Sequence, residues 1–144
     1  MRVLALSGGI ATGKSTVGKM IHRLMPTSAF FDCDETVQCL LKEQEVLEEI
    51  SETLGQSLIK TDGSLDRATL RKIVFENEIS REKLETILHP KVRKECLEKL
   101  NFYSRTSSTT LFVADVPLLF ESGFDFGQEL NLVVATSQAT QRNR

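Results

Sequence analysis

The amino-acid sequence predicts an α/β fold in which helices flank a parallel β-sheet. Short apolar segments alternate with segments whose apolar residues recur at helical spacing, which is the order expected when helices connect parallel strands. The first apolar segment also runs directly into two glycines that precede a helical pattern. For a chain of 144 residues we expect one domain, in which residues from about 60 to 105 form a helical subdomain.

The first third of the chain is predicted to alternate strands and helices. The expected elements are a strand at residues 2–7, a helix at 14–24, a strand at 28–31 and a helix at 35–41. Gly8 and Gly9 follow the first strand directly, which is typical of a tight turn. Asp32 and Asp34 follow the second strand, so two carboxylates are expected at the carboxyl end of a strand.

The middle of the chain is predicted to be mostly helical. The expected helices cover residues 43–54, 67–75, 80–89 and 91–100. Gly55 should end the first of these helices and Asp66 should cap the second, after a turn at Asp62-Gly63. Pro90 should end or kink the third helix before the helical pattern resumes toward Leu100.

The last part of the chain is predicted to return to strands. Residues 103–110 are rich in serine and threonine, which favours a surface loop. Residues 111–116 and 130–135 are apolar and short, as expected for two further buried strands of the same sheet.

Composition and charge argue against several classes of protein. The net charge is only -2 and both signs are mixed along the chain, so no broad nucleic-acid-binding surface is expected. The three cysteines lack metal-ligand or redox spacing, which favours a reducing compartment and hence the cytoplasm. The apolar run at residues 3–6 is too short for an export signal or a membrane span. The oligomeric state is left open.

A phosphate-binding loop, or P-loop, is the most specific motif in the sequence. It comprises Gly8, Gly9, Ile10, Ala11, Thr12, Gly13, Lys14 and Ser15. Glycines allow backbone N–H groups to surround phosphate oxygens, and the N-terminus of the following helix favours negative charge. A glycine-rich turn that merely joins a strand to a helix is the alternative. We disfavour it because the lysine and the serine both follow in register.

The side chains of this loop indicate a site for a nucleotide and Mg²⁺ in a P-loop NTPase-like fold. Lys14 is expected to reach the terminal phosphates, and the hydroxyl of Ser15 is expected to ligate Mg²⁺. Thr16 should support the start of the helix. The motif alone is compatible with hydrolysis, phosphoryl transfer or switching, so the acceptor must be inferred from other groups.

Asp32 and Asp34 are the candidate acceptor-side groups. A carboxylate at a strand end, where parallel sheets open their ligand crevice, can orient an acceptor hydroxyl or a magnesium-bound water. Either aspartate could instead be an ordinary helix N-cap, but the adjoining P-loop favours the catalytic interpretation. Asp115 ends an apolar strand as a Walker B carboxylate does, although a strand-end turn residue explains it equally well.

The sequence resembles the dephospho-CoA kinase family along almost its whole length. The matching segments are the P-loop from Ser7, Phe31 to Asp34, Asp62 to Arg67 with Leu70, Val74 and Phe75, then Leu84-Glu85, Leu88-His89-Pro90 and Pro117 to Glu121. The resemblance implies transfer of the terminal phosphate of ATP to the ribose 3′-hydroxyl of dephospho-CoA, the last step of coenzyme A biosynthesis. It also implies that Asp34 is the general base and that Asp32 helps to place magnesium or substrate.

The same resemblance implies a helical CoA-binding subdomain. It assigns Arg67, His89 and Arg93 to the region where cations meet the diphosphate of the substrate. Pro117, Leu118 and Glu121 would border the substrate in the loop after the strand at 111–116. His89 could instead be a buried or capping histidine, Arg93 a surface cation and Glu121 a helix-end carboxylate.

The resemblance reaches the beginning of the family's lid at the end of this chain. Gln141 and Arg144 match the start of that lid, and Arg144 is expected to contact ATP. We expect the remaining lid and the C-terminal elements of the family to be missing after residue 144, and turnover to be poor for that reason. A nucleotide-binding protein with little activity, or another small-molecule P-loop kinase, is the alternative function.

Overall fold

The computed structural model describes residues 1–8, 13–106, 108–116 and 124–134, except for the side chain of Ser15. Its residues form two compact units. The sheet unit comprises Met1–Asp34 and Arg93–Arg144, and the helical unit comprises Glu35–Val92. None of the described helices is long and apolar enough to cross a membrane.

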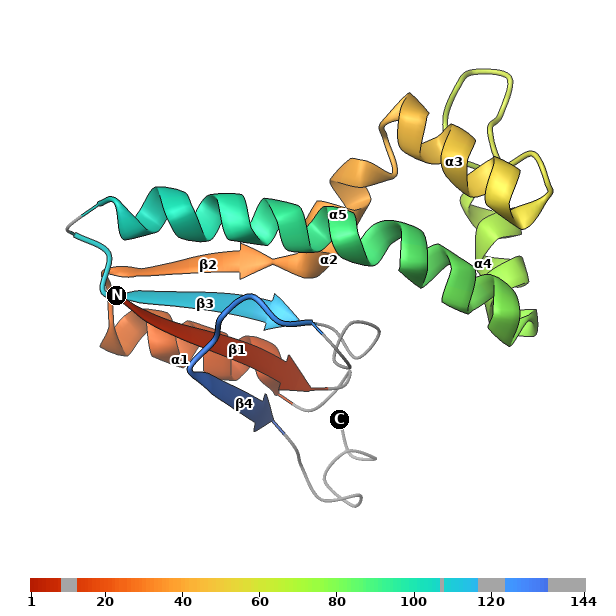
Figure 1. Cartoon of the computed structure of the whole chain (residues 1–144). Coiled ribbons are helices and arrows are strands. Elements are labelled where there is room, and N and C mark those ends of the chain that lie inside the picture. The colour runs from red at the N-terminus through yellow and green to blue at the C-terminus, as the bar shows by residue number, and fades with distance from the viewer. Residues whose placement is uncertain (9–12, 107, 117–123, 135–144) are drawn as a thin grey trace, which may run out of the picture. The chain divides into compact units, whose positions relative to one another are not determined.

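The sheet unit is built on four parallel strands in the order β2-β3-β1-β4 (Figure 1). The strands are β1 (Arg2–Gly8), β2 (Ser28–Asp32), β3 (Leu111–Val116) and β4 (Leu130–Val134). This arrangement confirms the predicted parallel sheet, and all four strands lie within one residue of their expected bounds. The two central strands, β1 and β3, carry an almost continuous run of buried residues, as expected when both faces of a sheet are covered.

Helix α1 (Lys14–Leu24) covers one face of the sheet. Its residues Val17 and Ile21 pack against buried leucines and a valine of β1 and β3. A Cβ atom added to Gly18 would lie 3.8 Å from Leu6 and 3.9 Å from Phe30, so α1 approaches the sheet closely at this glycine. The side chains of β1 that anchor α1 therefore also fix where the helix begins.

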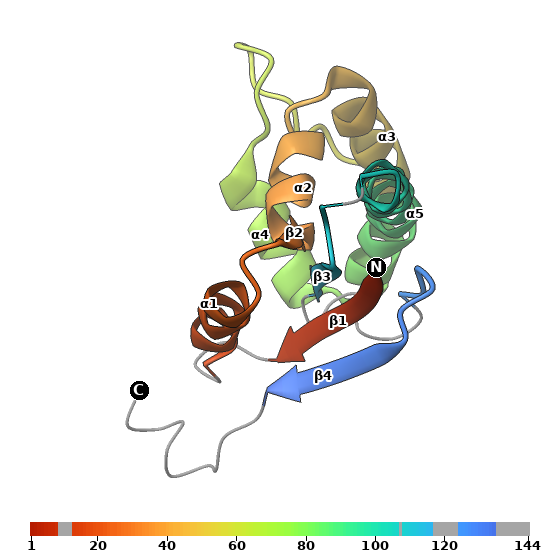
Figure 2. The same ribbon diagram turned by 90° about the vertical axis from the view of Figure 1, so that its left-hand side faces the viewer.

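Residues of β3 that alternate with the α1-facing ones pack on the other face of the sheet. Phe112 is fully buried, and its ring lies 6.2 Å from that of Tyr103 and 6.3 Å from that of Phe126, measured between centroids. Tyr103 belongs to the C-terminal part of α5 (Glu78–Ser104), which lies across the sheet from α1 in Figure 2. Aromatic burial on this second face completes the layered core.

Helices make up most of the helical unit. They are the greater part of α2 (Cys33–Leu40), all of α3 (Gln44–Leu54) and α4 (Arg67–Glu76), and the first part of α5. Gly55 ends α3 in a left-handed conformation with φ of 69°, and Asp66 Oδ1 accepts a hydrogen bond from the Thr69 N–H at 3.2 Å. Both caps were predicted from the sequence.

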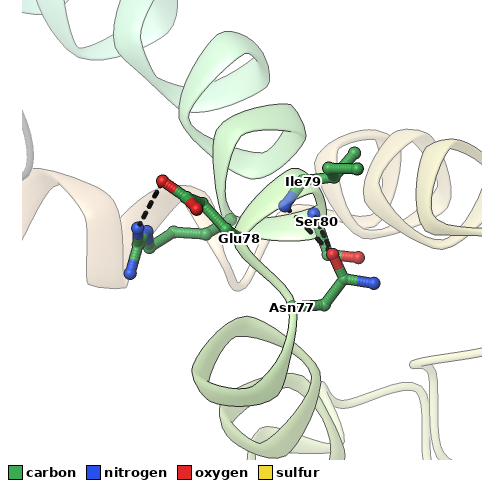
Figure 3. A network of polar contacts seen from close by, with 5 residues as sticks. Asn77, Glu78, Ile79 and Ser80 are labelled. Atoms are coloured by element: carbon green, nitrogen blue, oxygen red, sulfur yellow. Dashed lines mark hydrogen bonds and ion pairs between the residues drawn. The ribbon is translucent and has the colours of Figure 1, made fainter.

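Helix α5 begins earlier than predicted because Asn77 caps it. Asn77 Oδ1 accepts hydrogen bonds from the N–H groups of Ile79, at 3.0 Å, and Ser80, at 3.2 Å (Figure 3). These bonds satisfy two of the backbone donors that the first turn of a helix leaves without a helical acceptor. The start at Glu78 in place of Ser80 corrects the sequence prediction.

Pro90 was expected to end or kink the helix, and the first alternative is wrong, since α5 continues through it to Ser104. Proline removes one backbone donor, which costs α5 a single hydrogen bond to the carbonyl of Thr86. Leu88 and Val92, on either side of the proline, are almost fully buried. The apolar surface removed from water on both sides outweighs the lost bond. Tyr103 and Ser104, which were expected in a loop, form the last residues of this helix.

Candidate active site

The carboxyl ends of β1, β2 and β3 place the candidate catalytic groups beside one another. In the strand register, Asp115 of β3 is paired with Leu6 of β1 on one side and with Asp32 of β2 on the other. The residue after Leu6 and Ser7 is Gly8, which starts the P-loop. The order of the strands therefore brings the P-loop, the two strand-end aspartates and Asp115 to one edge of the sheet.

Lys14 is the first residue of α1 and reaches back to this edge. Its Nζ lies 2.6 Å from Asp115 Oδ1, a charge-assisted contact between two partly shielded side chains. The side chain of Lys14 is 17% exposed and that of Asp115 is 31% exposed. Gly13, which precedes the lysine, has φ of 88°, a left-handed conformation that glycine adopts without steric cost.

The carboxylates of Asp32 and Asp34 differ in their hydrogen bonding. Asp32 Oδ1 accepts a hydrogen bond from the Asp34 N–H at 2.9 Å, so Asp32 satisfies a backbone donor in the first turn of α2. This is the capping role that the sequence left open, and one carboxylate oxygen fills it. Asp34 is one residue inside α2 and is exposed to solvent, although neighbouring protein atoms shield part of its carboxyl.

The pKa of Asp34 is raised above its ordinary value. Partial burial is the largest cause, the negative charge of Asp32 is the next, and Asp115 adds to it, whereas the ammonium of Lys14 opposes the shift. A carboxylate with a raised pKa binds a proton more tightly than a free aspartate does. Asp34 is therefore a stronger base than an isolated aspartate, which is the property required of a general base.

The cysteines in this region are not nucleophiles. Cys33 lies between the two aspartates in sequence but is fully buried, and burial and neighbouring negative charges raise the pKa of its thiol. Burial raises the pKa of Cys96 to about 12, despite an opposing effect of Arg93. Both thiols stay protonated at neutral pH, and protonated thiols are unreactive.

The predicted ATP-binding residues are only partly within the described structure. Gly8 ends β1, Gly13 caps α1, Lys14 is paired with Asp115, and Thr16 is exposed on α1. Gly9, Ile10, Ala11, Thr12 and Arg144 lie outside the described residues, as does the side chain of Ser15. Their roles stay predictions.

The predicted substrate-binding cations lie in different local settings. Arg67 Nη1 donates a hydrogen bond to Gln38 Oε1 at 2.7 Å within the helical unit. His89, also in the helical unit, is half-buried on α5. Arg93 belongs to the sheet unit, and its Nε donates to the backbone oxygen of Asp125 at 2.5 Å. Pro117, Leu118 and Glu121 lie outside the described residues. Arg67 and Arg93 thus each have a local protein partner.

A cavity in the helical unit adjoins Arg67. Its volume is about 570 Å³, and it is lined by Lys42 and Lys60 as well as by Arg67. Asp62 and Asp66 also border it, and hydrogen bonds from Ser64 and Thr69, respectively, lower the pKa of these two carboxyls and so favour their charged form. The wall of this cavity therefore carries three cationic and two anionic side chains.

In the described part of the chain, no group of three or more His, Cys, Asp or Glu side chains could hold a metal ion. A closed protein cage for a metal is therefore lacking among these residues. Mg²⁺ at a phosphoryl-transfer site does not require one, because phosphate oxygens and water supply most of its ligands.

Comparison with known proteins identifies the family. The family model for dephospho-CoA kinase matches residues 2–144. The chain belongs to the dephospho-CoA kinase family. This membership agrees with the parallel sheet, the P-loop sequence and the aspartates at the strand ends.

Two bacterial relatives match nearly the whole chain. A dephospho-CoA kinase of Fusobacterium nucleatum is 38% identical over 99% of this chain and 70% of its own length. One from Symbiobacterium thermophilum is 41% identical over 100% of this chain and 59% of its own length.

The solved structures agree with this assignment of the fold. A crystal structure from Thermus thermophilus has a TM-score of 0.75 and 27% identity, and the match covers 99% of this chain and 69% of that one. A dephospho-CoA kinase from Campylobacter jejuni has a TM-score of 0.63 and 29% identity over 85% of this chain and 61% of its own. This chain therefore spans between three-fifths and seven-tenths of the length of these relatives.

Proposed function

We propose that this protein transfers the terminal phosphate of ATP to the ribose 3′-hydroxyl of dephospho-CoA, giving coenzyme A and ADP. The observation that carries the proposal is the placement of Lys14 and Asp34 at one edge of the sheet in a member of the dephospho-CoA kinase family. A cation for the phosphates and a base for the acceptor are the two groups that this reaction requires of a P-loop kinase.

In this proposal the P-loop binds the phosphates of ATP. From the sequence motif, backbone N–H groups of the P-loop would donate to phosphate oxygens, and Lys14 would donate to the terminal phosphates. The N-terminus of α1 adds its partial positive charge. Thr16 and Arg144 complete the proposed set of ATP-binding residues.

Asp34 acts as the general base in this proposal. Its carboxylate takes the proton of the 3′-hydroxyl while that oxygen forms a bond to the terminal phosphorus. The bond between this phosphorus and the oxygen bridging to ADP breaks, and ADP leaves with the bond's electron pair. The negative charge of Asp32 raises the pKa of Asp34 and so strengthens the base.

Magnesium would be held by the hydroxyl of Ser15 together with phosphate oxygens and water. The lack of a closed metal cage among the described residues is compatible with this mode of binding. When bound, the ion offsets negative charge on the transferring phosphoryl group.

The remainder of dephospho-CoA would contact the helical unit, as a CoA-binding subdomain. Arg67 and the lysines of the adjoining cavity supply positive charge suited to the diphosphate. His89, Arg93, Pro117, Leu118 and Glu121 are the other proposed substrate-binding residues. The free state of all three cysteines supports a cytoplasmic location.

Acceptor specificity tests this function. The protein is incubated with Mg-ATP and, separately, with dephospho-CoA, AMP or shikimate, and products are identified by mass spectrometry. We expect coenzyme A from dephospho-CoA and no phosphorylated product from the other two acceptors. The Fusobacterium nucleatum relative serves as the positive control. Product from the control alone, or transfer to AMP or shikimate in preference, would contradict the proposal.

A further inference from the structure

We infer that Asp115 is a positioning residue for Lys14, which it holds at the phosphate site so that the ammonium contacts carboxylate and phosphate together. This inference rests on the proposed function, because it assigns a role within the ATP site. The sequence left Asp115 undecided between a Walker B carboxylate and a turn residue. Its contact with Lys14, at 2.6 Å, distinguishes it from an ordinary turn residue.

Asp115 lies on a central strand of the sheet, which fixes the position of its backbone. It lies on β3, which is hydrogen-bonded to β1 on one side and to β2 on the other, between Leu6 and Asp32 in the register. The neighbouring residues Ala114 and Val116 are buried. A carboxylate on such a strand has little freedom to move, so it is a fixed anchor for a flexible partner.

The Lys14 side chain is flexible, so an ion pair that restricts its ammonium affects the geometry of the phosphate site. A lysine side chain has a flexible four-carbon stem, and an unheld ammonium would sample many positions. Asp115 restricts this sampling before nucleotide arrives, so less order has to be imposed on binding. The ammonium has three N–H donors, so it can donate to phosphate oxygens while its ion pair with Asp115 is kept.

The ion pair is accessible to a ligand. Lys14 and Asp115 both line an open cavity of about 380 Å³ within the sheet unit. The Lys14 charge also reaches Asp34, because it opposes the rise in the pKa of that carboxyl. A lysine held here offsets the negative charge of the strand-end carboxylates, which would otherwise repel phosphate.

Two other roles for Asp115 make different predictions. A turn residue would affect stability only. A carboxylate that acts on Mg²⁺ would affect nucleotide binding through the metal, and would do so whether or not Lys14 is present. A positioning residue acts through Lys14, so its effect must disappear when Lys14 is removed.

A double-mutant cycle measures this dependence. We would determine the dissociation constant of ATP, titrated to millimolar concentration with and without Mg²⁺, for wild type, Asp115→Ala, Lys14→Ala and the double variant. We expect Asp115→Ala to weaken binding roughly tenfold in the wild-type background and less than about twofold beside Lys14→Ala, a coupling in the range for residues in contact. Asp115→Asn should fall between, because the amide keeps a polar oxygen near Lys14 but removes the negative charge.

Controls separate the possible failures. Glu98, exposed on α5 in the same unit, provides a matched acidic control, since Glu98→Ala should leave ATP binding unchanged. If Asp115→Ala does not fold, Asp115→Asn with Lys14→Met completes the cycle. Equal weakening in both backgrounds, tighter binding without Asp115, or an effect seen only with Mg²⁺ would overturn the inference. Failure of the wild type to bind ATP would overturn the proposed function as well.

Discussion

At the scale of single residues, Asp34 has the clearest expected dependence on pH. A general base must be ionised, so activity should be lost as pH falls through the raised pKa of this carboxyl and recovered above it. Asp32→Asn removes a negative charge that raises this pKa, yet an asparagine oxygen can still cap α2. We therefore expect the acidic midpoint of kcat/KM to move to lower pH in Asp32→Asn.

The measurement for this prediction is the pH–rate profile of both proteins. Thermal unfolding at each pH serves as the control for loss of folded protein. A midpoint that stays in place or moves upward would show that Asp32 does not control the base.

The candidate residues at the ends of β1 and β2 stand out in the sequence, whereas the contact between Lys14 and Asp115 does not. Lys14, Asp32 and Asp34 stand out because each follows a recognisable strand or loop in the sequence. The ion pair of Lys14 with Asp115 depends on β3 lying between β1 and β2. That strand order is a property of the folded sheet, and no local pattern around Asp115 specifies it.

At the scale of elements, the start of α5 provides a test of local stability. Asn77→Ala removes the acceptor for two backbone N–H groups and should cost about 0.5–2 kcal/mol in the free energy of unfolding. Asn77→Asp retains a side-chain acceptor at the same place and should remain close to wild type. Urea unfolding followed by circular dichroism measures both, and equal stability of the alanine variant would contradict the capping role.

The elements also show where local sequence rules apply and where packing overrides them. Glycine at the end of α3 and aspartate before α4 acted as their local chemistry predicts. Pro90 did not end α5, because buried residues on both sides stabilise the helix through it. The loss of one hydrogen bond can be read from the sequence, but the compensating burial depends on which residues pack against the helix.

At the scale of the whole molecule, the parallel sheet was predictable because apolar strands and amphipathic helices alternate along the chain. The division into a sheet unit and a helical unit was harder to predict from the sequence, because α2 and α5 each contribute residues to both units. A helical pattern in the sequence does not reveal which unit each part of a long helix joins. The CoA-binding role of the helical unit is a proposal that rests on the family and on the cavity beside Arg67.

In the proposed reaction Lys14 binds the phosphates of ATP and Asp34 activates the acceptor hydroxyl. Coenzyme A formation and the dissociation constant of Mg-ATP, measured together on wild type, Lys14→Ala and Asp34→Asn, separate these two roles. We expect Lys14→Ala to impair both quantities. Asp34→Asn should leave ATP binding within about twofold of wild type and slow phosphoryl transfer by about 10²–10⁴-fold, as for loss of a general base. Undiminished transfer in Asp34→Asn would contradict this role of Asp34.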